Sequence, residues 1–335
     1  MKAVYISDFG GPEVLEIRDV PDPREPGEGE VLVRVLNAGL NRADLLQRRG
    51  LYPPPDGYDP RIPGLEFAGR VYKAGSGVEE FKENDRVFGI AAGEAQAEYI
   101  LTDQRLIAHI PEIDTWDAAA VPEAYVTAND ALITQAGLRA REAVVIHAIA
   151  SGVGIAAAQI AKAAGAVVVG TSRSREKLER FGKLLFQGEP LADHLINTET
   201  GPHFADNVKE FTDGRGADVV LDLVGGDYFP ENVRCMAEKA RMMLVGLTAG
   251  RKAEFDMSIA LAKRLTIKGT VLRSRSMDEK AEAMENFKRE IVPRIGPRGL
   301  FFPEVDRYFP LEEVREAHQY LETNKSFGKV VLSLA

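Results

Sequence analysis

The sequence predicts an α/β protein in which a doubly wound parallel sheet is inserted into a β-rich domain. Three observations carry this prediction. Short, continuously apolar strands alternate with helical stretches between residues 144 and 271. Glycines follow the carboxyl ends of several of these strands, where open α/β sheets bind ligands. The flanking segments carry strand patterns separated by glycine- and proline-rich turns, and 335 residues are long for a single core, so two domains are expected.

The most informative segment is 144–155. An apolar, β-branched run ends there in a turn of small residues, and an alanine-rich helix, expected over 156–164, follows at once. In this setting, backbone amides and a positive helix N-terminus bind the pyrophosphate of a dinucleotide. The strict GxGxxG pattern is not kept, because Ile149 and Ser151 stand at its first two glycine positions and only Gly154 remains. The alternation of strands and helices around this segment, more than the motif itself, therefore predicts dinucleotide binding. The alternative is that these are ordinary turn glycines of a doubly wound domain.

The remaining elements follow from apolar runs bounded by turn residues. Further strands of the parallel sheet are expected at 166–170, 194–197, 217–222, 241–246 and 265–271, with a helix after 170 and another near 203–213. In the β-rich part, a mostly antiparallel sheet or barrel is expected, with strands at 31–36, 67–72 and 328–332 and helices at 41–50, 278–290 and 310–322. The segment 182–190 has no function that the sequence suggests.

Composition excludes several classes of protein. Hydrophobic residues at 45% and charged residues at 28% are ordinary for a globular protein, and a net charge of −9 without a basic stripe argues against nucleic acid as a partner. No apolar run reaches 18 residues, and the first residues lead directly into a strand, so neither a membrane span nor a secretory leader is expected. The single cysteine, Cys235, rules out an intrachain disulfide and fits a cytoplasmic location.

Six segments, taken in order along the chain, carry a resemblance to one superfamily. They are 38–45, 52–55, 121–128, 146–154, 272–275 and 327–332. The chain resembles the medium-chain dehydrogenase/reductase superfamily along essentially its whole length. Within it, the chain is most similar to the zinc-free quinone oxidoreductases, the branch that includes zeta-crystallin and the quinone oxidoreductases induced by the animal tumour-suppressor response. The resemblance implies a GroES-like catalytic domain at 1–123 and 272–335, a Rossmann domain at 124–271, and NADPH in the cleft between them.

The residues present argue against a metal. A catalytic zinc needs three Cys, His or carboxylate ligands plus an open position. The zinc-dependent relatives have a Cys where this chain has Asn41, and a His where it has Leu65. Glu66 and Asp44 remain, but two carboxylates alone are a poor ligand set for zinc. The single cysteine excludes a structural zinc site with four Cys ligands, and the five histidines are not spaced as metal ligands. We therefore expect no metal.

Without a metal, the cofactor carries the hydride, and the protein supplies orientation, hydrogen bonds and exclusion of water. A quinone accepts a hydride readily, which fits a pocket without a recognisable acid–base pair. The resemblance implies that Tyr52 and Thr127 contact the nicotinamide end and that Asn41 borders the acceptor, with Tyr125 as a further catalytic candidate. Tyr52 can equally be a surface aromatic, Tyr125 a packing residue, and Glu123 only a first-turn acid of a helix.

Sheet geometry and the resemblance together imply the other cofactor contacts. The pyrophosphate is expected at Ser151, Gly152, Val153 and Gly154; further contacts are expected at Gly225, Gly246, Leu247, Val271, Leu272 and Asn324. Relatives pair their last Rossmann strand across a two-fold axis, so a homodimer is expected, and the run 272–275 can belong to a subunit interface instead of the site.

The end of the second strand predicts NADPH rather than NADH. NAD-specific domains commonly place an acid about 20 residues past the glycine turn, where it binds the ribose 2′-hydroxyl. Here, hydroxyls and cations stand at that strand end, and they suit a 2′-phosphate. The candidates are Ser172, Arg173, Lys177 and Thr198, with Glu176 as the one acid near the expected spacing. The alternative is that these are solvated charges at a helix start.

The sequence thus predicts an NADPH-dependent quinone oxidoreductase acting without zinc. One alternative is an enoyl reductase of the same superfamily, which would also need a proton donor to carbon, such as Tyr52 or Tyr125. A second alternative is a non-catalytic NADPH-binding protein, because crystallin and RNA-binding roles occur in the branch that the chain resembles.

Overall fold

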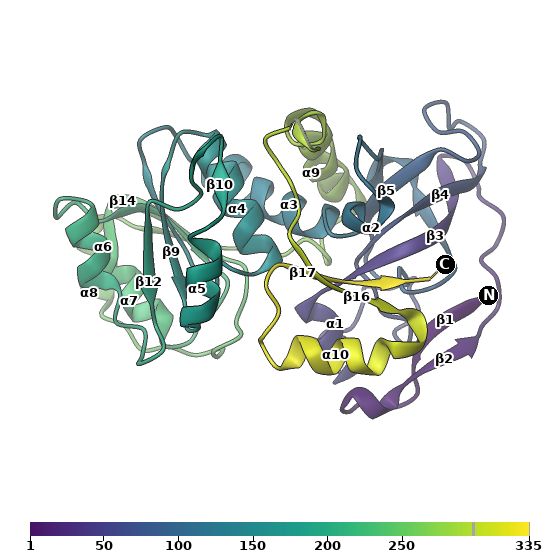
Figure 1. The fold of residues 1–335 in the computed structure, drawn as a ribbon, viewed down its shortest axis with the longest axis horizontal. Coiled ribbons are helices and arrows are strands. Elements are labelled where there is room, and N and C mark those ends of the chain that lie inside the picture. Colours follow the sequence, from purple (N-terminus) through teal and green to yellow (C-terminus); the bar gives the residue numbers. More distant parts are fainter. Residues whose placement is uncertain (297–298, 335) are drawn as a thin grey trace. The chain divides into compact units, whose positions relative to one another are not determined.

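The structure is a computed structural model, and it describes residues 1–296 and 299–334. The chain divides into two compact units (Figure 1). Unit 1 comprises Met1–Val126 together with Leu272–Ala335, and unit 2 comprises Thr127–Val271. The first division falls inside one helix, α3 (Pro122–Asn129), so that its Glu123 belongs to unit 1 and its Thr127 to unit 2.

Unit 1 is built on a mixed seven-stranded sheet. The strand order is β16-β17-β3-β4-β5-β7, and β6 also pairs with β3; every pairing is antiparallel except that of β16 with β17. The strands are β3 (Glu30–Leu40), β4 (Glu66–Ala74), β5 (Arg86–Ile90), β6 (Tyr99–Asp103), β7 (Ile107–His109), β16 (Val305–Pro310) and β17 (Lys329–Ser333). The long strand β3 pairs with β17, β4 and β6, so residues from the two ends of the chain meet on it.

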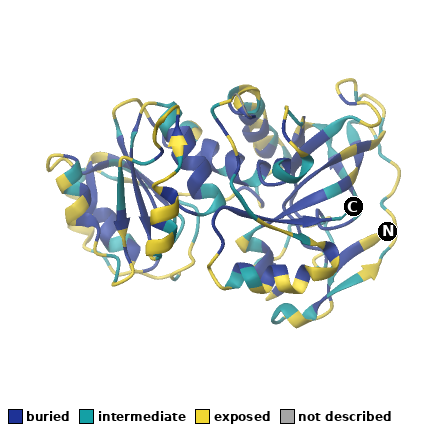
Figure 2. Cartoon of the chain, in the orientation of Figure 1, coloured by how far each residue is buried: buried dark blue, intermediate teal, exposed yellow. Residues whose placement is uncertain are grey.

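The remaining elements of unit 1 lie outside this sheet. They are β1 (Lys2–Ile6), β2 (Leu15–Asp19), α1 (Arg42–Arg48), α2 (Thr115–Ala118), α9 (Met277–Glu290) and α10 (Val314–Glu322), with 3-10 turns at Pro12–Val14, Gln104–Leu106, Val292–Arg294 and Leu311–Glu313. Strands β1 and β2 pair with each other in a separate antiparallel sheet. Helix α10, yellow in Figure 1, packs against β17 and β2 and buries Val314, Ala317 and Leu321. In Figure 2 its outer positions are yellow, as expected of an amphipathic helix.

Unit 2 is built on a six-stranded parallel sheet in the order β12-β9-β8-β13-β14-β15. The strands are β8 (Ala143–Ile146), β9 (Val167–Ser172), β12 (His194–Asn197), β13 (Ala217–Asp222), β14 (Met236–Leu244) and β15 (Thr266–Gly269). The order is that of a Rossmann domain, in which ligands bind outside the carboxyl ends of the strands. Val145, Val169 and Val220 belong to its buried core, which explains why these strands are continuously apolar.

Helices alternate with these strands. They are α4 (Gly152–Ala163), α5 (Arg175–Phe181), α6 (Ala205–Phe211), α7 (Tyr228–Cys235) and α8 (Met257–Lys263); Asp130–Gln135 continues α3 as a π-helical turn. Helix α4 packs on β8 and β9, and α7 and α8 pack on β14. The segment 182–190 folds as a small hairpin, β10 (Leu185–Phe186) and β11 (Glu189–Pro190), whose turn residues Gln187 and Gly188 both have positive φ.

The predicted fold class is confirmed, and one predicted helix begins later than expected. The expected helix at 310–322 is a helix only from Val314 onward, after a 3-10 turn. Pro310 instead ends strand β16, because Tyr308, Phe309 and Pro310 pair in register with residues 331–333 of β17. Tertiary pairing overrides the local pattern there. Among the described residues, no helix combines the length and the apolar character needed to cross a membrane.

Candidate functional site

The N-terminus of α4 in unit 2 is a backbone site held open by small residues. Ser151 caps the helix and accepts a hydrogen bond from the amide of Gly154 at 3.1 Å. A Cβ atom on Gly154 would meet the carbonyl oxygens of Ala148 and Ile149 at 2.5 and 2.6 Å, so the helix packs this closely only with glycine there. The amides of Gly152 and Val153 occupy the first turn, whose N–H groups have no acceptor within the helix. These features suit an anion such as a pyrophosphate.

The end of β9 gathers hydroxyls and cations. The Ser172 hydroxyl accepts the Ser174 amide at 3.2 Å, and Ser174 caps α5 by accepting the Lys177 amide at 3.2 Å. Arg173, between the two serines, is exposed, and Lys177 is half-buried. The sequence placed these residues together, and the structure puts them at the carboxyl edge of the parallel sheet, next to the strand that precedes α4.

Thr198 has a partner that the sequence did not suggest. It follows β12 and is buried, and its hydroxyl shares a 2.7 Å hydrogen bond with the hydroxyl of Tyr228, on α7. Burial raises the pKa of Tyr228, and the Arg173 guanidinium lies close enough to oppose that rise. Tyr228 therefore lies near the residues that follow β9 and β12, although 30 positions separate it from Thr198 in the sequence.

Asp222 shapes the glycine turn that follows β13. Its Oδ1 accepts the amides of Val224 and Gly225, both at 2.8 Å, and Gly225 takes a positive φ of 66°. The Asp222 carbonyl also accepts the amide of Gly246 at 3.2 Å, and a Cβ there would meet the Leu223 carbonyl oxygen at 2.6 Å. Hydrogen bonds to one residue, Asp222, thus position the backbone of both predicted glycines, Gly225 and Gly246.

A buried polar chain connects this turn with the end of β9. Asn232 donates from Nδ2 to Asp222 at 2.9 Å, and its Oδ1 lies 2.6 Å from Nε2 of His147. Nδ1 of His147 lies 2.8 Å from the Thr171 hydroxyl. Burial lowers the pKa of His147, so the ring is neutral, with Nε2 protonated toward Asn232 and Nδ1 accepting from Thr171. No sequence pattern indicated this series of buried hydrogen bonds.

The other predicted cofactor residues are less tightly placed. Leu247 and Val271 in unit 2 are exposed, and Thr127 is half-buried. In unit 1, Leu272 is buried, whereas Asn324 is exposed, has a positive φ and accepts a hydrogen bond from Arg42.

In unit 1, Asn41 lies in a buried ionic cluster. Asn41 caps α1, donates from Nδ2 to Glu66 at 2.9 Å, and accepts from Nζ of Lys329 at 2.7 Å. Lys329 also donates to the Leu40 carbonyl at 2.9 Å and forms an ion pair with Oε1 of Glu66. The side chains of Lys329 and Glu66 are only 7% and 0% exposed, so this is a desolvated pair whose partners need each other.

Two further carboxyl groups border this cluster. Asp44 is buried and accepts the amides of Asn41 at 2.7 Å and Gly64 at 3.2 Å, and burial raises its pKa to about 6. Glu123 donates its backbone amide to Oε2 of Glu66 at 2.9 Å. Burial raises the pKa of the Glu123 carboxyl to about 8, with a further rise from Glu66 and Asp44. Three carboxyl side chains and one amide, from α1 with its N-cap, β4 and α3, thus lie around one ammonium group.

Arg273 holds the loop of Tyr52. The guanidinium is buried and donates to the carbonyls of Ala92 and Tyr52, at 2.7 and 2.8 Å, and to Oε1 of Gln47. It also lies 5.0 Å from the centre of the Tyr52 ring, a cation–π arrangement. Tyr52 is half-buried, and burial together with the nearby Glu123 raises its pKa. A surface aromatic would not be fixed in this way.

Tyr125 is placed differently from Tyr52. It is only 2% exposed, and its ring packs edge-on against Phe301 at 6.2 Å between centroids. Of the two roles considered from the sequence, this burial supports packing.

A zinc ion does not fit the Asn41 cluster. Asn41 offers an amide, Leu65 is a buried apolar residue, and the one well-placed carboxylate, Glu66, is already bonded to an ammonium group. A metal cation next to Lys329 would be repelled by it. Across residues 1–296 and 299–334, no three His, Cys, Asp or Glu side chains lie together in a way that would hold a metal ion.

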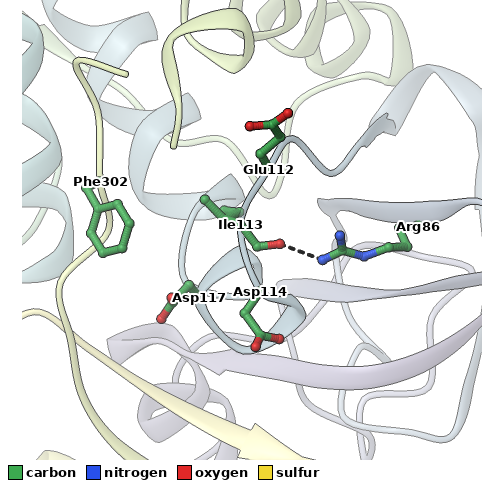
Figure 3. Close-up of a pocket in the computed structure, with 6 residues that line it drawn as sticks. All are labelled: Arg86, Glu112, Ile113, Asp114, Asp117 and Phe302. Carbon is green, nitrogen blue, oxygen red and sulfur yellow. Dashed lines mark hydrogen bonds between the residues drawn. The ribbon is translucent and has the colours of Figure 1, made fainter. Parts of the chain in front are cut away.

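A separate open pocket of about 390 Å³ lies elsewhere in unit 1 (Figure 3). Its lining residues are Arg86, Glu112, Ile113, Asp114, Asp117 and Phe302, and Arg86 donates a hydrogen bond to the Ile113 carbonyl. It shares no lining residue with the Asn41 cluster.

Comparison with known proteins assigns the family. Residues 27–130 match the alcohol dehydrogenase GroES-like domain, and residues 152–289 match the domain described as zinc-binding dehydrogenase. A quinone oxidoreductase of Pseudomonas aeruginosa is 34% identical, with 99% of each chain covered. The chain belongs to the medium-chain dehydrogenase/reductase superfamily. Members of this superfamily are oxidoreductases, and the GroES-like and nucleotide-binding domains that the sequence predicted are confirmed.

Solved structures of the superfamily superpose over nearly the whole chain. The Escherichia coli quinone oxidoreductase in complex with NADPH has a TM-score of 0.83 and 29% identity, covering 99% of this chain and 100% of that one. The CurK enoyl reductase has a TM-score of 0.84 and 26% identity, covering 99% and 98%. Both reactions considered from the sequence thus occur among proteins of this fold.

Proposed function

We propose that the protein reduces quinones with NADPH and without zinc. The observation that carries this proposal is the ammonium group of Lys329, bonded to both Asn41 and Glu66. This ammonium group occupies the oxygen ligands that Asn41 and Glu66 could offer, and its charge would repel a metal cation, so these residues do not form a zinc site. Quinones need no Lewis acid, because the ring gains aromatic character when it accepts the hydride. The similarity to quinone oxidoreductases supports the same choice.

The cofactor proposal rests on unit 2. The amides of Gly152 and Val153 would bind the pyrophosphate, and the glycine turn after β13, whose conformation Asp222 stabilises, would offer further backbone contacts. Arg173 and Lys177 would bind the 2′-phosphate, with Ser172, Thr198 and Tyr228 as nearby hydroxyls. NADPH rather than NADH is favoured because Arg173 directly follows β9 and no carboxylate stands at the strand end; the one nearby acid, Glu176, lies in the first turn of α5 beside Lys177.

Unit 1 supplies the groups around the acceptor. NADPH, when bound, provides the hydride. Asn41, held between Glu66 and Lys329, would orient the acceptor, and Tyr52, fixed by Arg273, would contact the nicotinamide end together with Thr127. Because these side chains are locked by buried partners, little reorganisation is needed when the reactants bind.

Steady-state oxidation of NADPH separates the proposed function from its alternatives. The protein should turn over with a panel of quinones and give little turnover with 2-enoyl-CoA thioesters. Turnover with the thioesters alone would assign an enoyl reductase, the reaction of the similar CurK structure. Tight NADPH binding without turnover on either panel would indicate a non-catalytic binding protein.

We propose further that two copies associate through β15. This strand is an edge of the parallel sheet among the described residues, and the adjacent helix α8 exposes Leu261 at 81% and Met257 at 74%. Analytical ultracentrifugation should give a dimer, and Leu261→Asp should shift it toward monomer. A monomeric wild type at micromolar concentration would contradict this. The single buried cysteine supports a cytoplasmic location.

A further inference from the structure

The reaction that we propose needs a proton as well as a hydride. Reduction of a quinone to a hydroquinone adds one hydride from NADPH and one proton at the second oxygen. The sequence showed no acid–base pair for this step, and the buried cluster of unit 1 contains a candidate that was considered only as a helix acid, Glu123.

The backbone of Glu123 is fixed, but its carboxyl group is not engaged. Its amide donates to Oε2 of Glu66 at 2.9 Å, and Oε1 of the same glutamate is held by Asn41 and Lys329. Within residues 1–296 and 299–334, the Glu123 carboxyl makes no hydrogen bond, and the side chain is half-buried. A carboxyl group that is anchored through its backbone and has free donor capacity is suited to meet a ligand.

Charged groups from several elements of unit 1 act on the Glu123 carboxyl group. Glu66 on β4 and Asp44 on α1 disfavour a third anion there, whereas Lys329 on β17 and Arg273 favour one. Lys280 on α9 and the Tyr52 hydroxyl also lie within electrostatic range. Burial and the two carboxylates outweigh the cations, so the pKa of Glu123 rises to about 8, and the group carries its proton at neutral pH.

We propose that Glu123 is the acid that protonates the acceptor oxygen in quinone reduction, which rests on the proposed function above. The hydride leaves NADPH as NADP⁺ forms, and it reduces the quinone. The Glu123 O–H bond breaks as a new O–H bond forms on the quinone oxygen that becomes negative. The hydroquinone leaves, and the Glu123 carboxylate takes a proton from solvent, which its half-buried position allows.

Kinetics of Glu123→Gln test this role, because glutamine keeps the shape and the backbone contact but is not an acid. We expect kcat for quinone reduction to fall at least about 100-fold, with little change in the Kd for NADPH. Glu123→Asp should restore part of the rate. Glu282→Gln, on the exposed face of α9, is the matched control and should behave as wild type. Circular dichroism checks the fold of each variant.

The pH dependence gives a second kinetic readout. Wild-type kcat should be highest where Glu123 is protonated and should fall as the pH rises through about 8. In Glu123→Gln this fall should disappear. If wild type turns over quinones and Glu123→Gln does so at the same rate with the same pH dependence, the role of Glu123 is overturned and the quinone assignment stands. No quinone turnover in wild type would overturn the assignment and the role together.

A third readout needs no reaction. In protein without cofactor, ¹³C NMR of labelled glutamate side chains should show one carboxyl titrating near pH 8, and that signal should be absent in Glu123→Gln. The stability of wild type relative to this variant should also decline between pH 4.5 and about 8, because the folded state prefers the protonated acid. A Glu123 carboxyl that is fully ionised at pH 7 would contradict the proposal.

Discussion

The candidate cofactor region of unit 2 and the candidate acceptor region of unit 1 use different kinds of groups. In unit 2, the backbone makes the site, through the first-turn amides of α4 and the glycine turn that Asp222 fixes. In unit 1, side chains make it, through the buried pair of Lys329 and Glu66. A backbone site is tolerant of most side-chain changes that avoid its close approaches, whereas a buried ion pair depends on both partners. The two regions should therefore fail in different ways when they are mutated.

The largest effect is expected from Lys329→Met. It leaves Glu66 buried without its cation, and Asn41 and the Leu40 carbonyl lose a donor. Breaking a buried pair by removing one partner costs about 3 to 5 kcal/mol of unfolding free energy, measurable by urea denaturation.

Two further variants show whether the ion pair is the cause. Lys325→Met, at an exposed lysine of the same segment, should change stability by less than about 0.5 kcal/mol. Adding Glu66→Gln to Lys329→Met should recover part of the loss, because the unpaired charge is removed. A Lys329→Met protein as stable as wild type would mean that Glu66 does not depend on this ammonium group.

A smaller and more selective effect is expected in unit 2. Arg173→Ala should weaken NADPH binding by about 1.5 to 3 kcal/mol, the range for a hydrogen bond to a charged group, and Lys177→Ala should act in the same direction. NADH binding should barely change, because it lacks the 2′-phosphate. Isothermal titration of both cofactors measures the difference, with Arg180→Ala at the other end of α5 as control. Equal losses for the two cofactors would remove these cations from the 2′-phosphate site.

The smallest effect is expected at Tyr52. Tyr52→Phe removes one hydroxyl and should cost on the order of 1 kcal/mol in NADPH binding or in kcat/KM. Tyr52→Ala also removes the ring beside Arg273, so its effect should be larger, with the fold intact. Tyr58→Phe, in the same half-buried loop, should behave as wild type. Unchanged kinetics for Tyr52→Ala would exclude Tyr52 from the site.

The difference between the regions also explains what the sequence predicted. The α4 site is local: a strand, a turn and a helix lie within residues 144–155, and the requirement for glycine at 154 is visible in the sequence. The partners of Lys329 lie 263 and 288 positions away, at Glu66 and Asn41, so it was seen only as a residue of the last strand. No period or motif links such positions before the sheet brings β17 beside β3.

The same reasoning accounts for the other residues that sequence patterns missed. Tyr228 and Asn232 lie on α7, where they look like ordinary helix residues until the parallel sheet brings α7 near Thr198 and Asp222. Glu123 matched a common first-turn acid, and only its neighbours distinguish it. Conversely, the helix expected from Pro310 begins only at Val314, because the pairing of Pro310 with β17 is not a local property.

The central claim is that the cation bonded to Asn41 and Glu66 is the ammonium group of Lys329 and not a metal. It is tested most directly by assaying NADPH-dependent quinone reduction before and after exhaustive chelation, with the metal content measured on the same sample. We predict no stoichiometric zinc and an unchanged kcat after chelation, because Lys329 already binds Asn41 and Glu66. Stoichiometric zinc, or activity that is lost on chelation and restored by zinc, would contradict the claim.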